Sequence, residues 1–370
     1  FLVRALCHNL TGQTLGEYMQ THLCTLTGAD FHLGLDPKAH RRCADLIGPN
    51  RARNQRADLA PVRQPARAVP RSDLAIRTQE NPIIRPYQDA CSSAWRQAEI
   101  PALMAGVRAL IVRNRTKVTA ALIAATPDLR VVGRLGVGLD NIDLDACRGA
   151  GVEVIPATGA NTLSVAEYVV TNALVLLRNA YLARNAMEAG AWPRSQCSGR
   201  EVAGRKLGLV GFGAIARETA RLAKALGMEV CAFDPIVSQD DPAWTGIERL
   251  SFDDVLGGSD VISLHVPLTP QTHHMINAAR LTQMREGAVL INAARGGVVD
   301  EDALASALRD GRLGGAALDV FETEPLTAEA AQIFRGIGNL ILTPHIAGVT
   351  DDSNTRVSKM IADLVLDRLQ

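Results

Sequence analysis

Residues 206–216 read KLGLVGFGAIA, and this stretch decides the fold that the sequence predicts. An apolar run at its start is followed by two glycines, Gly211 and Gly213, and then by an alanine-rich helical pattern. The next apolar run ends at Asp234. A glycine-rich turn between a strand and a helix, with an acidic residue after the following strand, is a dinucleotide-binding fingerprint. The stretch therefore predicts a dinucleotide-binding α/β unit, and a glycine turn in an unrelated α/β protein is the weaker alternative.

Each residue of this turn has a predicted task. Gly211 permits the tight turn, and Gly213 lets a pyrophosphate reach the backbone amides of Ala214 and Ile215. Asp234 is expected to accept hydrogen bonds from the ribose hydroxyls of the adenosine. Because a carboxylate repels a 2′-phosphate and no arginine follows to offset it, the expected cofactor is NAD and not NADP.

Four later apolar runs also stop at polar residues, and the same edge of the sheet is expected to collect them. These runs end at His265-Val266-Pro267, at Asn292-Ala293-Ala294-Arg295, at Asp319 and at Pro344-His345. In a doubly wound sheet, ligands bind in the crevice at the carboxyl ends of the strands. The predicted fold class is therefore α/β, with a doubly wound Rossmann nucleotide-binding domain, and the family resemblance given below implies a smaller flavodoxin-like α/β substrate domain beside it.

Two of these residues have side chains suited to acid–base chemistry on a small anion. A guanidinium such as that of Arg295 can hold a carboxylate in two parallel hydrogen bonds. A histidine such as His345 can exchange a proton with an alcohol or ketone oxygen, which contributes roughly 10²–10⁴-fold to a rate. A carboxylate from the preceding segment 319–325 could fix its tautomer. A surface arginine and a core histidine are the alternatives, which the Arg–Glu–His order on three successive strand ends makes weaker.

The other histidines receive lesser roles. His265 is expected to line the cofactor and not to catalyse. His273 and His274 have no carboxylate or cysteine at ligand spacing, so the sequence predicts an exposed loop there and no metal site.

Composition excludes several classes of function. The 370 residues are 47% hydrophobic and balance 39 basic against 39 acidic residues, so no net field attracts nucleic acid or a membrane surface. No apolar stretch is long enough to span a membrane. The seven cysteines are widely spaced and odd in number, which indicates free thiols and a cytoplasmic location.

Three regions follow from composition and periodicity. Residues 1–100 are rich in proline and arginine without a regular period, which indicates a disordered or misread segment more than a nucleic-acid arm or a transit peptide. Residues 158–345 are expected to form the NAD-binding domain, and the resemblance given below implies that residues 101–157 form part of a substrate domain that 346–370 completes. Because the chain begins with Phe1, we expect a fragment or a processed product.

A long apolar helix is predicted over residues 162–186, with Thr162 or Ser164 as its N-cap. Since it is apolar on more than one face, it either packs against a second subunit in a homodimer or is buried within its own subunit.

Taken together, these motifs and the GVGLDN stretch at 136–141 resemble the D-2-hydroxyacid dehydrogenase family from about residue 102 onward. The resemblance implies a catalytic triad of Arg295, Glu324 and His345, where Glu324 is chosen over Glu322 because it directly precedes a proline. It also implies sets of cofactor and substrate residues. The implied cofactor residues, beyond those of the glycine turn and Asp234, are Val137, Val266, Pro267, Ala293, Ala294, Arg295, Asp319, His345 and Gly348, with Asp319 on the nicotinamide carboxamide. The implied substrate residues are Arg113, Asn114, Val137, Gly138, Arg295 and His345.

The family chemistry is reduction of a 2-oxo acid by hydride from NADH, with His345 donating the proton, or the reverse. Arg113 and Arg115 could bind a second anionic group of the substrate, or Arg115 could face solvent. The overall likeness to members of the family favours a sulfolactate-type substrate over phosphoglycerate or hydroxypyruvate. Two alternatives remain. One is an NAD-sensing, corepressor-like binding protein, and the other is a catalytically impaired fragment, since 1–100 do not clearly supply the rest of the substrate domain.

Overall fold

The computed structural model describes residues 12, 100–101, 104, 106–114 and 116–369. The predictions for the first hundred residues and for Arg115 therefore lie almost wholly outside the described residues. The chain forms two compact units, of which unit 1 comprises residues up to Ala157 together with Val357 onward, and unit 2 comprises Thr158–Arg356.

The sheet of unit 2 contains seven strands, all paired in parallel, in the described part of the chain. Their order is β10-β9-β8-β7-β4-β5-β6. The strands are β4 (Lys206–Val210), β5 (Glu229–Phe233), β6 (Glu248–Arg249), β7 (Val261–Leu264), β8 (Val289–Asn292), β9 (Gly315–Leu318) and β10 (Leu340–Leu342). The order reverses between β4 and β7, which is the switch point of a doubly wound sheet. The predicted α/β fold class is confirmed.

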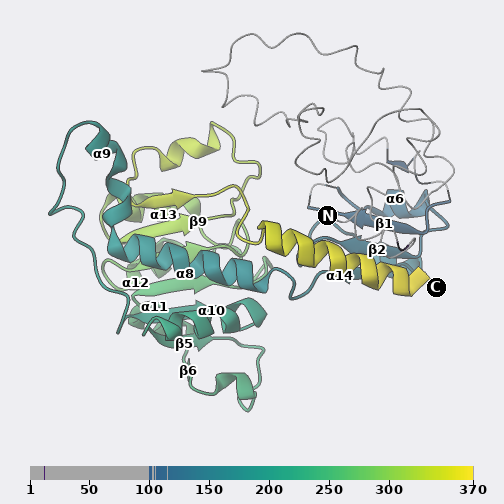
Figure 1. Ribbon diagram of the computed structural model, residues 1–370, viewed down its shortest axis with the longest axis horizontal. Helices are drawn as coiled ribbons and strands as arrows, with labels where there is room; N and C mark the ends of the chain where they lie inside the picture. Colours follow the sequence, from purple (N-terminus) through teal and green to yellow (C-terminus); the bar gives the residue numbers. More distant parts are fainter. Residues whose placement is uncertain (1–11, 13–99, 102–103, 105, 115, 370) are drawn as a thin grey trace, which may run out of the picture. The chain divides into compact units, whose positions relative to one another are not determined.

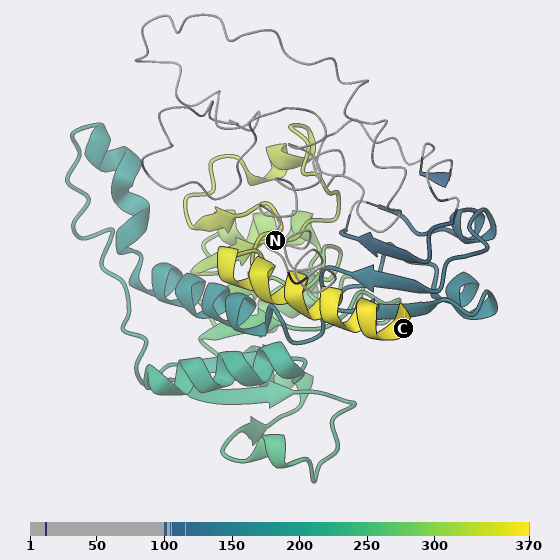
Figure 2. The same cartoon turned by 45° about the vertical axis from the view of Figure 1, so that its right-hand side comes forward.

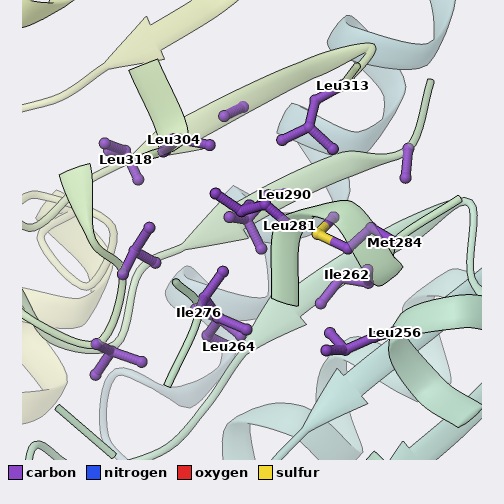
Figure 3. Close-up of a cluster of buried hydrophobic side chains, with 14 of the residues drawn as sticks. Leu256, Ile262, Leu264, Ile276, Leu281, Met284, Leu290, Leu304, Leu313 and Leu318 are labelled. Atoms are coloured by element: carbon purple, nitrogen blue, oxygen red, sulfur yellow. The ribbon is translucent and has the colours of Figure 1, made fainter. Parts of the chain in front are cut away.

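Helices cover both faces of this sheet (Figure 1). On one face α8 (Thr162–Arg178) and α10 (Ala214–Ala225) lie side by side, as the view turned by 45° also shows (Figure 2). On the other face are α11 (Phe252–Gly258), α12 (Ala278–Gln283) and α13 (Glu301–Arg309), which enclose a core of leucine, isoleucine and methionine side chains (Figure 3). Helices on both faces explain why the central strands are mostly apolar and are buried along their whole length.

Helix α8 is shorter than predicted. It ends at Arg178 because Asn179 adopts a left-handed conformation, with φ of 53°, and Asn179 donates its amide to the carbonyl of Val175. The chain then makes the 3₁₀ turn η6 (Ala180–Ala183) and the short helix α9 (Arg184–Glu188). The N-cap position belongs to Asn161 and no side chain caps it, so the prediction of Thr162 or Ser164 as the cap is wrong.

Most apolar side chains of α8 are buried inside unit 2. Val169, Ala173 and Leu177 belong to the core that the helix shares with α10 and the sheet. Of the two explanations offered for this apolar helix, burial within its own subunit accounts for these residues. Apart from Leu163, which is 39% exposed, the exposed large apolar residues come later, in the segment that carries α9 away from the sheet, where Tyr181 is 71% and Trp192 is 77% exposed (Figure 1).

Unit 1 is a smaller α/β unit built on a three-stranded parallel sheet in its described part. Its elements are β1 (Ala109–Val112), α6 (Ala120–Ala124), β2 (Val131–Arg134), α7 (Leu144–Gly149) and β3 (Glu153–Pro156). The side chains of Thr119 and Asp143 cap α6 and α7 by accepting from first-turn amides. The chain's last helix, α14 (Asp351–Leu369), packs on this sheet so closely that a Cβ on Gly133 would lie 2.7 Å from Ile361.

The chain returns to unit 1 at Val357, later than the expected residue 346. Contacts with the start of α8 explain the difference. A Cβ on Gly348 would meet the side chain of Asn161, and Arg356 donates to the carbonyl of Ala160. The remaining short elements are η7 (Pro242–Trp244) and η8 (Ala330–Phe334), both in unit 2.

Candidate active site

The six strand ends that the sequence singles out, the glycine turn and five polar ends, lie at one edge of the unit 2 sheet. Parallel pairing brings the carboxyl ends of neighbouring strands together, and backbone hydrogen bonds continue past the strands themselves. The amide of Asp319 donates to the carbonyl of Asn292 at 3.0 Å, and the amide of His345 donates to the carbonyl of Asp319 at 2.8 Å. Across the switch point between β7 and β4, the amide of His265 donates to the carbonyl of Val210 at 2.7 Å. The structure thus brings together the strand ends that the sequence singled out.

In the glycine turn after β4, neighbouring atoms leave no room for a side chain at Gly211, whereas Gly213 faces open space. Gly211 has φ of 90°, and a Cβ there would lie 2.6 Å from the carbonyl oxygen of His265. Gly213 is the N-cap of α10, its backbone is extended, and a Cβ there would meet no atom within 4 Å. No side chain caps this 12-residue helix, and Ala214 at its start is exposed. The arrangement leaves first-turn amides directed outward, where a pyrophosphate can accept from them.

Asp234 is held by the backbone around it. Its carboxylate accepts hydrogen bonds from the amides of Phe212 at 2.7 Å, Ile236 at 2.8 Å and Val237 at 3.0 Å. Burial opposes ionisation of this carboxyl, but these amides and the nearby charge of Arg217 outweigh it, so its pKa is lowered. A carboxylate fixed beside the glycine turn matches what the ribose of NAD requires, and the residues present fit this cofactor.

The two glycines lead to opposite expectations for alanine substitutions. Gly213→Ala should leave the thermal unfolding of the protein unchanged and raise the dissociation constant of NADH by about tenfold, because the new methyl group faces only the space assigned to the pyrophosphate. Gly211→Ala should instead lower the free energy of unfolding by about 1–2 kcal/mol or more, since φ is positive and the Cβ meets backbone. Calorimetric titration and thermal unfolding of both variants measure this. Unchanged NADH affinity in Gly213→Ala would contradict the placement.

The end of β7 supplies a neutral histidine. Burial lowers the pKa of His265 to about 4, and its Nε2 lies 3.0 Å from the hydroxyl of Ser263. A side chain that stays uncharged is unsuited to proton exchange near neutral pH. That His265 lines the cofactor stays a prediction. Val266 is close to the glycine turn, since its Cγ1 would be 3.2 Å from a Cβ on Gly211, and Pro267 is exposed.

The loop after β8 presents Arg295. Asn292 is 1% exposed and shapes this loop, because its amide nitrogen donates to the carbonyl of Arg295 at 2.9 Å and its oxygen accepts from the amide of Ala294 at 3.1 Å. The guanidinium of Arg295 donates to the carbonyl of Ala294 at 2.7 Å and is partly exposed, as are Ala293 and Ala294. The same loop is pressed against the segment after β9, since a Cβ on Gly296 would lie 1.8 Å from the carbonyl oxygen of Phe321.

His345 and Glu324 form an ion pair or hydrogen bond through Nδ1 and Oε2, which are 2.7 Å apart. The His345 side chain is 41% exposed and that of Glu324 is 33% exposed. The second Glu324 oxygen accepts from the amide of Phe321 at 3.1 Å, which orients the carboxylate toward the histidine. With Nδ1 engaged, Nε2 is the ring atom that can exchange a proton with a ligand. His345 has φ of 54°, an unusual backbone conformation for a residue other than glycine.

Asp319 holds the loop that carries His345. It is 1% exposed, and its carboxylate accepts from the hydroxyl of Thr343 at 2.5 Å and from the amides of Ile346 and Ala347, both at 2.8 Å. The structure therefore places the Asp319 side chain, at the end of β9, in contact with the loop that carries His345. Its expected contact with the nicotinamide carboxamide stays a prediction.

A second histidine–carboxylate pair was missed at the sequence level. His274 Nε2 lies 3.0 Å from Oε1 of Glu322, which is 48 residues away and therefore not at the short sequence spacing of metal ligands. The Glu322 amide donates to Glu301, whose pKa is raised by burial and by the nearby carboxylates despite that hydrogen bond. This pairing explains which glutamate serves which histidine: Glu322 pairs with His274, and Glu324 with His345.

Four predicted substrate residues lie on unit 1. Arg113 and Asn114 are exposed after β1, and Asn141 fixes their loop by donating to the carbonyls of Arg113 at 2.9 Å and Thr116 at 2.6 Å. Val137 is 39% exposed and Gly138 follows it, after Gly136 with φ of 157°. These residues form two loops at the carboxyl ends of β1 and β2. Their contact with a substrate stays a prediction.

Among the described residues, no cluster of three or more His, Cys, Asp or Glu could hold a metal ion. None of the helices that the structure describes is long and apolar enough to cross a membrane.

The chain is similar to known dehydrogenases over most of its described length. Residues 170–347 match the family model described as the NAD binding domain of D-isomer specific 2-hydroxyacid dehydrogenases. The (S)-sulfolactate dehydrogenase of Chromohalobacter salexigens is 57% identical over 262 residues, which are 70% of this chain and 84% of that protein. The D-3-phosphoglycerate dehydrogenase of Archaeoglobus fulgidus is 39% identical over 259 residues, 70% of this chain but only 49% of that longer protein.

A solved structure extends the similarity to the fold. The D-lactate dehydrogenase of Aquifex aeolicus, which was crystallised with NAD and lactic acid, has a TM-score of 0.65 and 31% sequence identity to this chain. The match covers 81% of this chain and 93% of that chain.

Proposed function

This chain belongs to the D-isomer specific 2-hydroxyacid dehydrogenase family, and on that premise we propose that Arg295, Glu324 and His345 carry its reaction. The chain is an NAD-dependent oxidoreductase that interconverts a 2-oxo acid and a 2-hydroxy acid by acting on a CH–OH group. The observation that carries the assignment of roles is the 2.7 Å contact between His345 and Glu324 at the carboxyl edge of the sheet.

His345 serves as the general acid when a 2-oxo acid is reduced. Glu324 engages Nδ1, which leaves Nε2 as the atom that gives its proton to the oxygen of the carbonyl group. In the oxidation direction, neutral His345 takes the hydroxyl proton through the same atom. The pair thus supplies one proton to, or removes one from, the oxygen while a hydride moves to or from carbon.

Arg295 binds the carboxylate of the acid. Its guanidinium donates to the carbonyl of Ala294, and a guanidinium can pair with both oxygens of a carboxylate. Withdrawal of electron density by this cation also favours attack at the neighbouring carbonyl carbon. When NAD is bound, it supplies the hydride acceptor, or as NADH the donor. Backbone amides at the start of α10 and the carboxylate of Asp234 hold it.

The proposed substrate class is a 2-hydroxy acid with a second anionic group, with sulfolactate first. Identity of 57% to an (S)-sulfolactate dehydrogenase supports this order, as does Arg113 on its exposed loop in unit 1. The experiment is NADH oxidation with equal concentrations of 3-sulfopyruvate, 3-phosphohydroxypyruvate, hydroxypyruvate and pyruvate. We expect the highest kcat/KM with 3-sulfopyruvate and the lowest with pyruvate. A preference for pyruvate would contradict the second anionic group.

We also propose a homodimer in the cytoplasm. Tyr181, Met187 and Trp192 expose apolar side chains on the excursion after α8, which supports a second copy as their cover. The described cysteines Cys147, Cys197 and Cys231 are free thiols, as expected in a reducing compartment. A light-scattering mass of one chain at micromolar concentration would contradict the dimer, and an oxidised thiol population in protein isolated from its cells would contradict the location.

A further inference from the structure

A partly buried chain of hydroxyl groups links helix α8 to the loop that carries His345. The hydroxyl oxygen of Tyr168, on α8, lies 2.8 Å from Oγ1 of Thr343 in the loop after β10. Oγ1 of Thr343 in turn lies 2.5 Å from Oδ1 of Asp319. Tyr168 and Thr343 are 175 residues apart in the sequence and have no part in the chemistry described above.

The direction of the protons in this chain is fixed. A threonine hydroxyl has one proton, and that of Thr343 is donated to the carboxylate of Asp319. The contact between Tyr168 and Thr343 therefore has the phenol as donor. Burial raises the pKa of Tyr168 to about 12; its hydrogen bond to Thr343 acts against this rise, and the charge of Asp319 adds to it. Tyr168 thus keeps its proton, and remains a donor, over the whole pH range in which a histidine can exchange protons.

The chain of hydroxyl groups ends at Asp319, which accepts hydrogen bonds from the backbone amides of residues 345–347. Asp319 accepts from the amides of Ile346 and Ala347, and its own carbonyl accepts from the amide of His345. His345 is held at φ of 54°, a conformation that costs energy in a residue other than glycine and persists only where the surroundings impose it. Asp319 is the residue that imposes it, and Thr343 and Tyr168 orient the Asp319 carboxylate.

From this geometry we propose that Tyr168 is a positioning residue for His345, acting through Thr343 and Asp319. The proposal rests on the proposed function, since it takes His345 as the group that exchanges the proton. Loss of the phenolic hydroxyl leaves Thr343 without its donor, so its side chain can rotate away from Asp319. The His345 loop then loosens, and the 2.7 Å contact with Glu324 is no longer held in one position. A displacement of about 1 Å at a reacting group can cost up to about 10²-fold in rate.

The first test is Tyr168→Phe, which removes only the hydroxyl. We expect kcat to fall about tenfold with KM for NADH unchanged, because the helix that binds the cofactor, α10, is not altered. The primary isotope effect with NADH deuterated at the transferred position should rise, as chemistry becomes slower relative to product release. Tyr181→Phe is the matched control, because Tyr181 lies in η6, outside the candidate active site, and phenylalanine keeps its apolar ring, so this variant should have wild-type kinetics. Wild-type kcat and isotope effect in Tyr168→Phe would overturn the proposal.

A double-mutant cycle distinguishes the relay from simple loss of packing. Thr343→Val should lower kcat by about as much as Tyr168→Phe, and Thr343→Ser should keep most of the activity because it keeps the hydroxyl. Tyr168→Phe made on top of Thr343→Val should have almost no further effect, since the link is already broken. Multiplication of the two losses would overturn the proposal. If Tyr168→Phe does not fold, the difference between Thr343→Ser and Thr343→Val is the deciding comparison.

Failure of the proposed function gives a different result. If the wild-type protein binds NADH but turns over no 2-oxo acid, the role of His345 as acid is wrong, and the positioning is then tested without activity. The Nδ1 proton of His345 has a low-field nuclear magnetic resonance when it is hydrogen-bonded to Glu324, and His345→Gln identifies this signal by its loss. The signal should shift or broaden in Tyr168→Phe and remain in Tyr181→Phe. An unchanged signal in Tyr168→Phe would overturn the proposal.

Discussion

Replacement of His345 by Gln should lower kcat for reduction of the preferred 2-oxo acid by about 10²–10⁴-fold, the usual contribution of a positioned general acid. This corresponds to about 3–5 kcal/mol of transition-state stabilisation. The amide of glutamine can still accept or donate a hydrogen bond but cannot give up a proton near neutral pH. The dissociation constant of NADH should change little, because the glycine turn and Asp234 are distant in sequence from this loop and are held by other contacts. Steady-state kinetics and an NADH titration measure both quantities.

His274→Gln is a closely matched control for this variant. His274 is also paired with a glutamate, at 3.0 Å, and also has a positive φ, of 46° against 54° for His345. The two substitutions therefore remove the same kind of ion pair and place glutamine in the same kind of backbone conformation. Only loss of the His345 side chain should impair proton exchange. An equal loss of kcat in the two variants would show that the effect is structural and would contradict the assigned role.

Gly296→Ala should cause the second large effect, on both stability and activity. Its Cβ would lie 1.8 Å from the carbonyl oxygen and 2.2 Å from the carbonyl carbon of Phe321, and backbone atoms cannot move aside as a flexible side chain can. The loop of Arg295 must therefore separate from the segment that carries Glu322 and Glu324. We expect a loss of about 1–3 kcal/mol in the free energy of unfolding, typical of an overpacked site, and a fall in kcat/KM of at least about 10²-fold.

Gly258→Ala is the control for this second prediction. Gly258 lies at the end of α11, and a Cβ there would meet no atom within 4 Å. Alanine is the better helix former by about 1 kcal/mol, so this variant should be as stable as the wild type or more stable, with unchanged kinetics. Chemical denaturation and steady-state kinetics of the two variants provide the comparison. A Gly296→Ala variant with wild-type kcat/KM would mean that the contact between the two loops does not matter for the reaction.

The arrangement of the main sheet could be predicted because local sequence determines it. The central strands β4, β7 and β8 are buried and mostly apolar, and parallel strands place their carboxyl ends at one edge, so the polar residues after the apolar runs could be assigned to that edge. The end of α8 could not be predicted in this way. The apolar pattern continues beyond Arg178, whereas the helix stops where Asn179 adopts the left-handed conformation that asparagine tolerates.

The supporting contacts of the site could not be read from the sequence for a different reason. His274 and Glu322 are 48 residues apart, and Tyr168 and Thr343 are 175 residues apart, so no local period or spacing signals either contact. Asp319 was recognised as a strand-end residue, but its burial and its three hydrogen-bond donors follow from the path of the 343–347 loop. Residue types at strand ends thus predict which chemistry is possible, and tertiary packing decides which residues hold those side chains in place.

The transfer of deuterium from NADH labelled at the transferred position to the product tests the central claim most directly. The purified chain is mixed with labelled NADH and 3-sulfopyruvate, and the product is analysed by mass spectrometry. The account predicts one deuterium on the carbon that bears the hydroxyl group of the product, formed by the wild type and by His274→Gln, and formed at a rate at least about 10²-fold lower by His345→Gln. A product without deuterium at that carbon, or equal rates in the wild type and His345→Gln, would contradict it.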